Sequence, residues 1–226
     1  IGLILLQAIY FRRRAHMLVH VRTIVESGMI TAAIVLPILL QPDLGSALLL
    51  VATWLGMLFV FGLRRAHLVA IVVAAMIVAV VGWSFFLKPY QRDRMQSFLW
   101  PNRDPQGAGY NQRQAVIAIG AGGIIGRGFG QGTQAQLRFL PEAQSDFLPA
   151  VIGEEFGLLG FGALLACLFV LLWRCAAIAR RCSDDFSAAV VVGFGVLFGI
   201  QASYNLAMNL GIAPVVGVPF PFVSGG

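Results

Sequence analysis

The stretch FLPAVIGEEFGLLGFGALLACLFVLLW, residues 147–173, decides the class of fold. Its only charged residues are Glu154 and Glu155, and it is longer than the ~20 apolar residues that a helix needs to cross a bilayer. The stretch therefore predicts a membrane-spanning helix. Carboxylates at that depth are costly and mark a protein interior or a watery cavity. The alternative is a structural ion pair with an arginine of the preceding loop, and the residues alone leave both interpretations open.

Composition places the rest of the chain in the same environment. Of 226 residues, 58% are hydrophobic and 12% are charged, whereas about 25% of residues in a soluble domain are charged. The mean hydropathy is +0.83. The fold class expected is all-α, a polytopic transmembrane helical bundle that forms a single, partial membrane domain over residues 1–226, with residues 1–11 as the end of a further helix. Apolar runs predict spans near residues 24–41, 44–63, 66–87, 147–173 and 186–212.

The net charge is +6, and the positions of the basic residues along the chain predict its orientation in the membrane. Short basic loops between spans face the cytoplasm, and alternation of the predicted spans puts all of them on one side. The segment 88–146 is then one long extracytoplasmic loop, and nucleic acid is a poor candidate partner. The basic residues of the short loops are Arg12, Arg13, Arg14, Arg22, Arg64, Arg65, Arg174, Arg180 and Arg181.

The predicted outer loop of about 59 residues is long enough to be functional or disordered. Its many apolar residues argue against disorder, and a short helix is expected over residues 112–125. Seven glycines lie in residues 120–132, but no strand precedes them and no Gly-Lys-Ser/Thr follows them. We interpret the run as close backbone packing rather than a phosphate-binding loop.

No cysteine or histidine spacing predicts a disulfide or a metal site.

Two polar features remain near the predicted outer surface. Gln201, Asn205 and Asn209 repeat every four residues in the last span, which favours hydrogen bonding between helices over a substrate path. Asp146 stands directly before Phe147 at the membrane surface. A carboxylate there is either a helix cap or a functional group.

Several motifs follow one another along the chain: QPDLGSA at 41–47, KPYQ at 88–91 with Arg94, DP and GAGYN at 104–111, GQGTQ at 130–134, LPE to DF at 140–147, and GEE at 153–155. Together they resemble the SEDS family, which comprises RodA, FtsW and SpoVE. The closing stretch PVVGVPFPFVSGG, residues 214–226, leans toward RodA. The sequence departs from the family's pattern in two places: Gln144-Ser145 stand where His-Thr is usual, and the tyrosine usual after the last serine is missing, so that Gly225 follows Ser224 directly.

The resemblance implies a peptidoglycan glycosyltransferase that polymerises lipid II at the outer face of the bacterial plasma membrane. Asp146 matches the family's loop aspartate and is expected to be the catalytic general base. Basic residues are expected to contact the pyrophosphate. The candidate substrate-binding residues are Lys88, Arg94, Arg138, Glu142 and Glu155.

The implied partners are lipid II, the nascent glycan strand, a class B penicillin-binding protein and membrane lipids. No cofactor is required by these motifs, and a need for a divalent cation such as Mg²⁺ stays open. A lipid II flippase or other transporter is one alternative, and it predicts a polar pathway across the full depth of the membrane. A non-catalytic scaffold for the penicillin-binding protein is the other, and it should tolerate loss of Asp146.

The predicted topology can be tested by cysteine labelling of the complete protein in intact cells. Asp43, Asp104 and Asp146 should lie outside and Arg13, Arg64 and Arg181 inside, because three independent basic loops agree. On a background without native cysteines, a cysteine at position 104 should react with an impermeant reagent and one at 181 should not. Protection of position 104 would show the orientation to be inverted.

Overall fold

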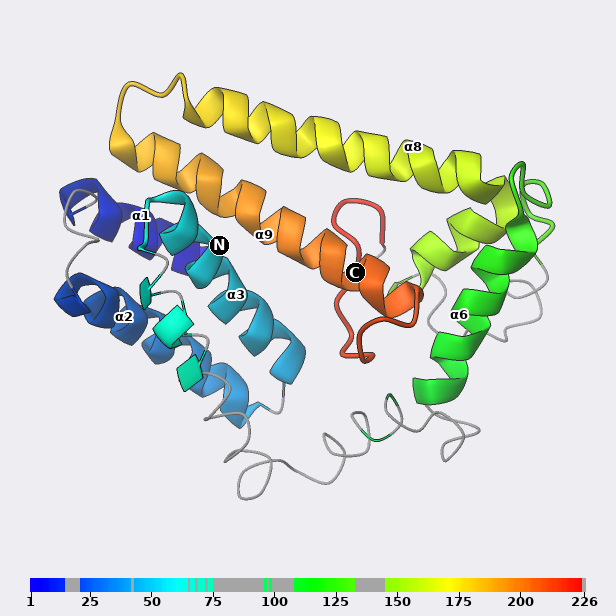
Figure 1. Cartoon of the computed structure of the whole chain (residues 1–226), viewed down its shortest axis with the longest axis horizontal. Coiled ribbons are helices and arrows are strands. Elements are labelled where there is room, and N and C mark those ends of the chain that lie inside the picture. The colour runs from blue at the N-terminus through cyan, green and yellow to red at the C-terminus, as the bar shows by residue number, and fades with distance from the viewer. Residues whose placement is uncertain are drawn as a thin grey trace. The chain divides into compact units, whose positions relative to one another are not determined.

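The protein is described by a computed structural model over residues 1–14, 21–41, 43–64, 66–67, 69–71, 73–74, 96, 98, 108–132 and 145–224. In these ranges every regular element is a helix (Figure 1), and the predicted all-α membrane fold is confirmed. The helices with defined bounds are α1 (Gly2–Arg14), α2 (Val21–Leu40), α3 (Leu44–Val60), α6 (Ala108–Gly122), α8 (Leu148–Ala179) and α9 (Asp185–Asn209).

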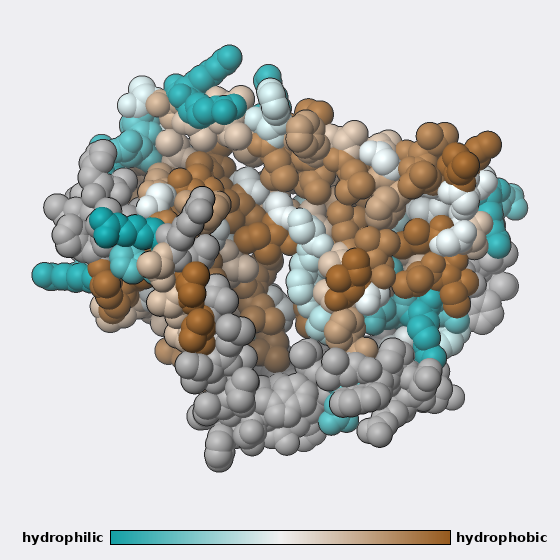
Figure 2. Space-filling model, viewed as in Figure 1, coloured by the Kyte–Doolittle hydropathy of each residue, from teal (hydrophilic) through white to brown (hydrophobic). Residues whose placement is uncertain are grey.

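Three of the described helices, α2, α8 and α9, are long and apolar enough to cross a membrane. Large apolar side chains stay on their surfaces: Leu158, Phe169 and Trp173 of α8 are 60–65% exposed. Figure 2 shows apolar side chains over much of the visible surface of the described helices. Such surfaces suit contact with lipid rather than water. The predicted span at 66–87 lies largely outside the described residues.

Two helices end three residues before their apolar runs end, and for the same reason. Gly62 after α3 and Gly211 after α9 have φ values of +95° and +76°. In each case the third residue past the end donates back to the last turn, Leu63 N–H to Leu58 O at 3.0 Å and Ile212 N–H to Ala207 O at 2.8 Å. This is the Schellman arrangement, in which an apolar residue lies just beyond the helix. That residue is buried at Leu63, which is 7% exposed, and exposed at Ile212, at 69%. Hydropathy therefore overestimates the length of both helices.

The N-termini of the same helices are closed by aspartates. Asp43 accepts a hydrogen bond from Ser46 N–H at 3.0 Å, and Asp184 accepts one from Ser187 N–H at 2.9 Å. The hydrogen bonds from the main chain and side chain of Ser187, with a smaller contribution from Arg12, lower the pKa of Asp184. Both side chains satisfy N–H groups that have no partner inside the helix.

The chain forms two compact units, one of residues Ile1–Leu87 with Leu171–Ile200 and one of Lys88–Val170 with Gln201–Gly226. The core of the first contains Phe11, Met57 and Leu58. It also contains buried polar contacts, since Gln7 Nε2 donates to Ser27 O at 2.8 Å. The core of the second unit consists of Ala115, Ala118, Phe147, Ala150 and Met208, so α6, the start of α8 and the end of α9 meet there.

Candidate functional site

The predicted span at 147–173 is interrupted in the structure. At Gly157, φ is 65° and ψ is −157°, which breaks α8 in two (Figure 1). The part after the break, residues 158–179, has a length of about 33 Å at 1.5 Å per residue, enough for the ~30 Å hydrocarbon core. Glu154 and Glu155 therefore belong to the short helical part that precedes the spanning part.

The break removes hydrogen bonds within α8, and the glycine-rich loop at 122–132 replaces them. Leu158 and Leu159 N–H donate to the carbonyl oxygens of Gly123 and Ile124, at 2.9 and 3.3 Å. In return, Glu154 O and Glu155 O accept from Arg127 and Gly128 N–H, both at 3.0 Å. Four main-chain groups that would otherwise lie unpaired in or near hydrocarbon are thus satisfied.

These exchanged bonds explain why the loop needs glycine. A side chain at Gly122 would overlap the main chain of Gly153, and one at Gly126 would overlap that of Glu155. Gly157 in turn lies against the main chain of Gly126 and Ile124. The interpretation of this run as close backbone packing is confirmed at these positions. At Gly123 there is open space, and the requirement is the positive φ of +55°.

Glu154 forms the ion pair with a loop arginine that the sequence offered as one of two interpretations. Its side chain is fully buried, and its Oε1 lies 3.8 Å from an Arg127 guanidinium nitrogen. A buried carboxylate needs such a partner, since removing one member of the pair leaves an uncompensated charge. Glu155 is partly buried beside Gly132 and is not fully enclosed.

Asp146 lies just before α8, at the junction of that helix with the core of its unit. The first helical bonds run from Ala150 and Val151 N–H to Phe147 O. Phe147, which is 1% exposed, therefore occupies the cap position, and Asp146 lies one residue outside it. The partly buried Asp146 faces Gly217: a Cβ at residue 217 would be 3.6 Å from Asp146 Oδ2.

Two fully buried asparagines of α9 hold the main chain at Asp146. Asn205 Nδ2 donates to Asp146 O at 2.8 Å, and Asn209 Nδ2 donates to the same oxygen at 3.1 Å. Asn205 Nδ2 also donates to Val218 O at 2.7 Å. A single amide group thus ties residue 146 to the segment that carries Gly217.

The segment after α9 is not helical and folds back along that helix. Gln201 Nε2 donates to Pro219 O and Tyr204 Oη to Pro214 O, both at 2.9 Å. From α6, Gln112 Nε2 donates to Ala213 O at 2.6 Å. Irregular backbone at membrane depth is tolerated where protein groups satisfy it. The polar stripe that was predicted to bond between helices therefore donates to main-chain carbonyls of non-helical segments, and Asn209 donates in addition to Asn205 O and Oδ1 within α9.

The structure thus brings Asp146 together with groups that sequence analysis did not connect to it: Gly217 and the two asparagines. The regular spacing of Gln201, Asn205 and Asn209 was the one signal that pointed to such a role. The candidate residues Lys88, Arg94, Arg138 and Glu142 lie outside the described residues. Within the described part of the chain, no three His, Cys, Asp or Glu residues form a group that could hold a metal ion.

These features define a multi-pass helical membrane protein with a carboxylate held at the start of a broken spanning helix. The chain belongs to the family of cell cycle proteins described as FTSW_RODA_SPOVE, whose model matches residues 1–226.

Curated relatives are similar over most of this chain. The peptidoglycan glycosyltransferase MrdB of Escherichia coli K12 is 42% identical over 205 residues, which cover 89% of this chain and 55% of that protein. The probable peptidoglycan glycosyltransferase FtsW of Allochromatium vinosum is 43% identical over 200 residues, covering 86% of this chain and 49% of that protein. The chain therefore spans about half the length of the curated relatives it matches.

Solved structures share the fold. A peptidoglycan synthase complex, described as coordinating polymerization and crosslinking, matches all of this chain and 62% of its own with a TM-score of 0.80 and 32% identity. A mutant of the rod shape determining protein RodA of Thermus thermophilus matches 96% of this chain and 55% of its own with a TM-score of 0.59. Its 24% identity supports the fold alone.

The exchange of main-chain bonds at Gly157 predicts different effects for two glycine substitutions. Gly126→Ala should destabilise the complete protein by roughly 1–3 kcal/mol or more, because the residue has a positive φ and a Cβ would overlap Glu155. Gly120→Ala is the matched control, since open space surrounds that helical position. Thermal unfolding in the same detergent compares the two variants. Equal stability of both would refute the packing role of the loop.

Proposed function

We propose that the protein containing this chain is a peptidoglycan glycosyltransferase that polymerises lipid II into glycan strands at the outer face of the bacterial plasma membrane. The observation that carries the proposal is the placement of Asp146. Its main chain is fixed by two buried asparagines, and its carboxylate lies against the backbone of Gly217. The names of the curated relatives support this reaction.

In the proposed reaction, Asp146 acts as a general base. It takes the proton from the 4-hydroxyl of the acceptor sugar while that oxygen attacks C1 of the donor sugar. The bond between C1 and the polyprenyl pyrophosphate breaks, and the pyrophosphate leaves with the bonding electrons. A general base must lie within hydrogen-bond reach of the proton it removes, which requires a fixed backbone at residue 146.

Other groups of the site are assigned by the same proposal. Lys88, Arg94 and Arg138 would neutralise the charge that develops on the pyrophosphate. Glu142 and Glu155 would contact the sugars. A class B penicillin-binding protein is the proposed partner, supported by the structural similarity to a synthase complex that couples polymerization to crosslinking.

The polar stripe of Gln201, Asn205 and Asn209, which was the feature that favoured a transporter, has another role in the structure. A substrate pathway would need polar side chains that are free to contact cargo along the last span. Instead, amide groups of Gln201, Asn205 and Asn209 donate to the main-chain carbonyls of residues 146, 218 and 219. These donors serve to fix the backbone of the site.

The test of catalysis is Asp146→Asn in the complete protein. A general base contributes about 10² to 10⁴ in rate, so lipid II polymerisation should fall by that factor. Asparagine retains the size of the side chain, so insertion and binding of the penicillin-binding partner should be preserved. Lipid II polymerisation and partner binding are both measured on the purified complex.

Asp184→Asn is the matched control, because it makes the same chemical change at a helix cap where asparagine also serves. It should polymerise lipid II at close to the wild-type rate. Near-wild-type polymerisation by Asp146→Asn would instead show that Asp146 is not the general base.

A second pair of variants tests how Asp146 is positioned. Asn205→Ala removes the link between residues 146 and 218 and should lower kcat roughly tenfold to a hundredfold with little change in KM, because small displacements of a reacting group are costly. Gln201→Ala removes a comparable bond to Pro219 but leaves residue 146 untouched, and it should have a much smaller effect. Equal losses in the two variants would indicate general destabilisation. The pH dependence of kcat provides a further readout of the environment of Asp146.

A further inference from the structure

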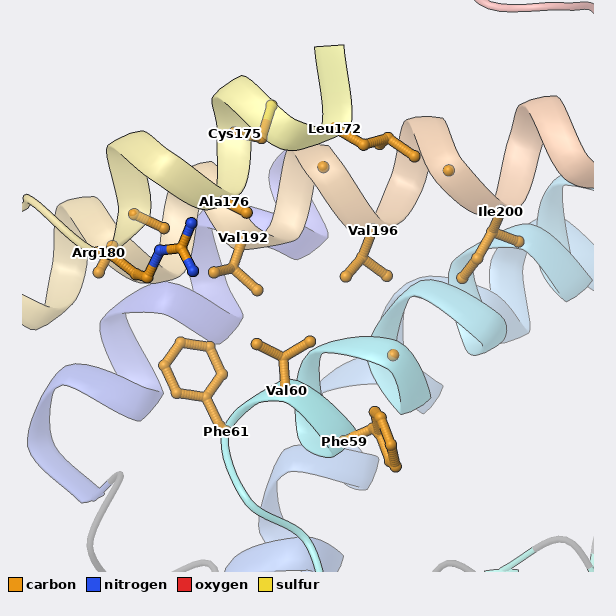
Figure 3. A pocket seen from close by; sticks show the side chains of 15 residues that line it. Phe59, Val60, Phe61, Leu172, Cys175, Ala176, Arg180, Val192, Val196 and Ile200 are labelled. Atoms are coloured by element: carbon orange, nitrogen blue, oxygen red, sulfur yellow. The ribbon is translucent and has the colours of Figure 1, made fainter. Parts of the chain in front are cut away.

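A groove of about 680 Å³ lies within the unit formed by residues Ile1–Leu87 and Leu171–Ile200. Its lining comes from Gly56 and residues 59–61 at the end of α3, from the end of α8 between residues 172 and 179 with Arg180 just after it, and from α9 between residues 188 and 200. In Figure 3, Val60 and Phe61 face Val192 across it, and Arg180 lies at one end. Arg180 is the one charged residue in a lining that is otherwise apolar apart from the thiol of Cys175.

The walls of the groove are packed helices. A Cβ on Gly56 of α3 would overlap the side chain of Val196 of α9. On the other side, a Cβ on Gly195 would lie 3.2 Å from Cys175 Cβ, and one on Gly199 would lie 3.5 Å from a methyl group of Leu172. Glycine therefore lets α3 and α8 approach α9, and α9 forms the floor between them.

The length of the groove identifies the kind of occupant. Residues 188–200 of α9 rise by about 18 Å, close to the ~15 Å depth of one leaflet of the hydrocarbon core. A further spanning helix would need a contact surface of about 30 Å. An acyl chain that enters from one membrane surface needs one leaflet only.

The charge of Arg180, at one end of the groove, indicates that the occupant carries an anionic headgroup. Arg180 is exposed and is the first residue of the turn between α8 and α9, so its guanidinium can reach the level of lipid headgroups. Arg12, Arg64 and Arg181 are further exposed bases of the same unit. The acidic residues of the turn are Asp184 and Asp185, and Asp184 is occupied as the cap of α9. Basic pockets between spanning helices on the cytoplasmic side suit anionic headgroups.

We propose that this groove binds one anionic phospholipid of the cytoplasmic leaflet. An acyl chain lies along α9 between α3 and α8, and the phosphate pairs with Arg180. This site is independent of the proposed catalytic function, because it shares no residue with the carboxylate site at Asp146.

The first test measures lipid retention by native mass spectrometry. The complete protein is equilibrated with mixed micelles that contain equal amounts of phosphatidylglycerol and phosphatidylcholine. Wild-type protein should retain phosphatidylglycerol preferentially, and Arg180→Gln should lower that preference about fivefold, the effect of one cationic side chain near a lipid headgroup. Arg174→Gln is the matched control, since this exposed arginine of α8 does not line the groove. Equal retention in wild type and Arg180→Gln would overturn the proposal.

The second test identifies what occupies the groove. A photoreactive amino acid at position 192 of the complete protein in membranes should crosslink to phospholipid. Crosslinks to another segment of the protein or to a second copy would instead show that protein covers the groove, and would overturn the proposal. Neither readout depends on glycan synthesis, so a negative result here is distinct from a failure of the proposed enzyme activity.

Discussion

The structure of the site depends on the exchange of four main-chain hydrogen bonds between the break in α8 and the glycine-rich loop. A helix that breaks near hydrocarbon leaves carbonyl and N–H groups that water does not reach. At Gly157 those groups find partners in the main chain of residues 123–128, so the break costs no unpaired group there. The same contact brings Arg127 to the buried carboxylate of Glu154. The glycine-rich loop and the break in α8 are thus held in place by the same hydrogen bonds.

The same constraint explains the asparagines of α9. The segment after this helix is irregular, and its carbonyl groups at residues 214, 218 and 219 are satisfied by side chains of Tyr204, Asn205 and Gln201. Asn205 and Asn209 extend this pattern to the carbonyl of residue 146. Asp146 therefore takes its position from main-chain bonding, while its carboxylate lies beside Gly217. The backbone at residue 146 is fixed by the bonds that its carbonyl oxygen accepts from the two asparagines.

Prediction from sequence succeeded where one residue type reports directly on its environment. Long apolar runs indicate spans because burial in lipid requires apolar side chains, and α2, α8 and α9 agree with them. The ends were overestimated at Leu63 and Ile212, since apolar residues past a glycine cap continue the hydropathy signal after the helix has ended. The short helix of the outer loop begins at Ala108 and ends at Gly122, because the following glycine has a positive φ.

Composition and ordered motifs were enough to predict the membrane class, the family and the candidate base, Asp146, because both are local properties of the chain. Three features emerged only from the folded chain: Glu154 pairs with Arg127, Gly157 breaks its helix, and the amides of α9 hold residue 146. Each of them depends on a partner distant in sequence, as Asn205 and Asp146 are 59 residues apart. A glycine or an asparagine in an apolar run shows that close approach or a hydrogen bond is available, and the folded chain supplies the partner.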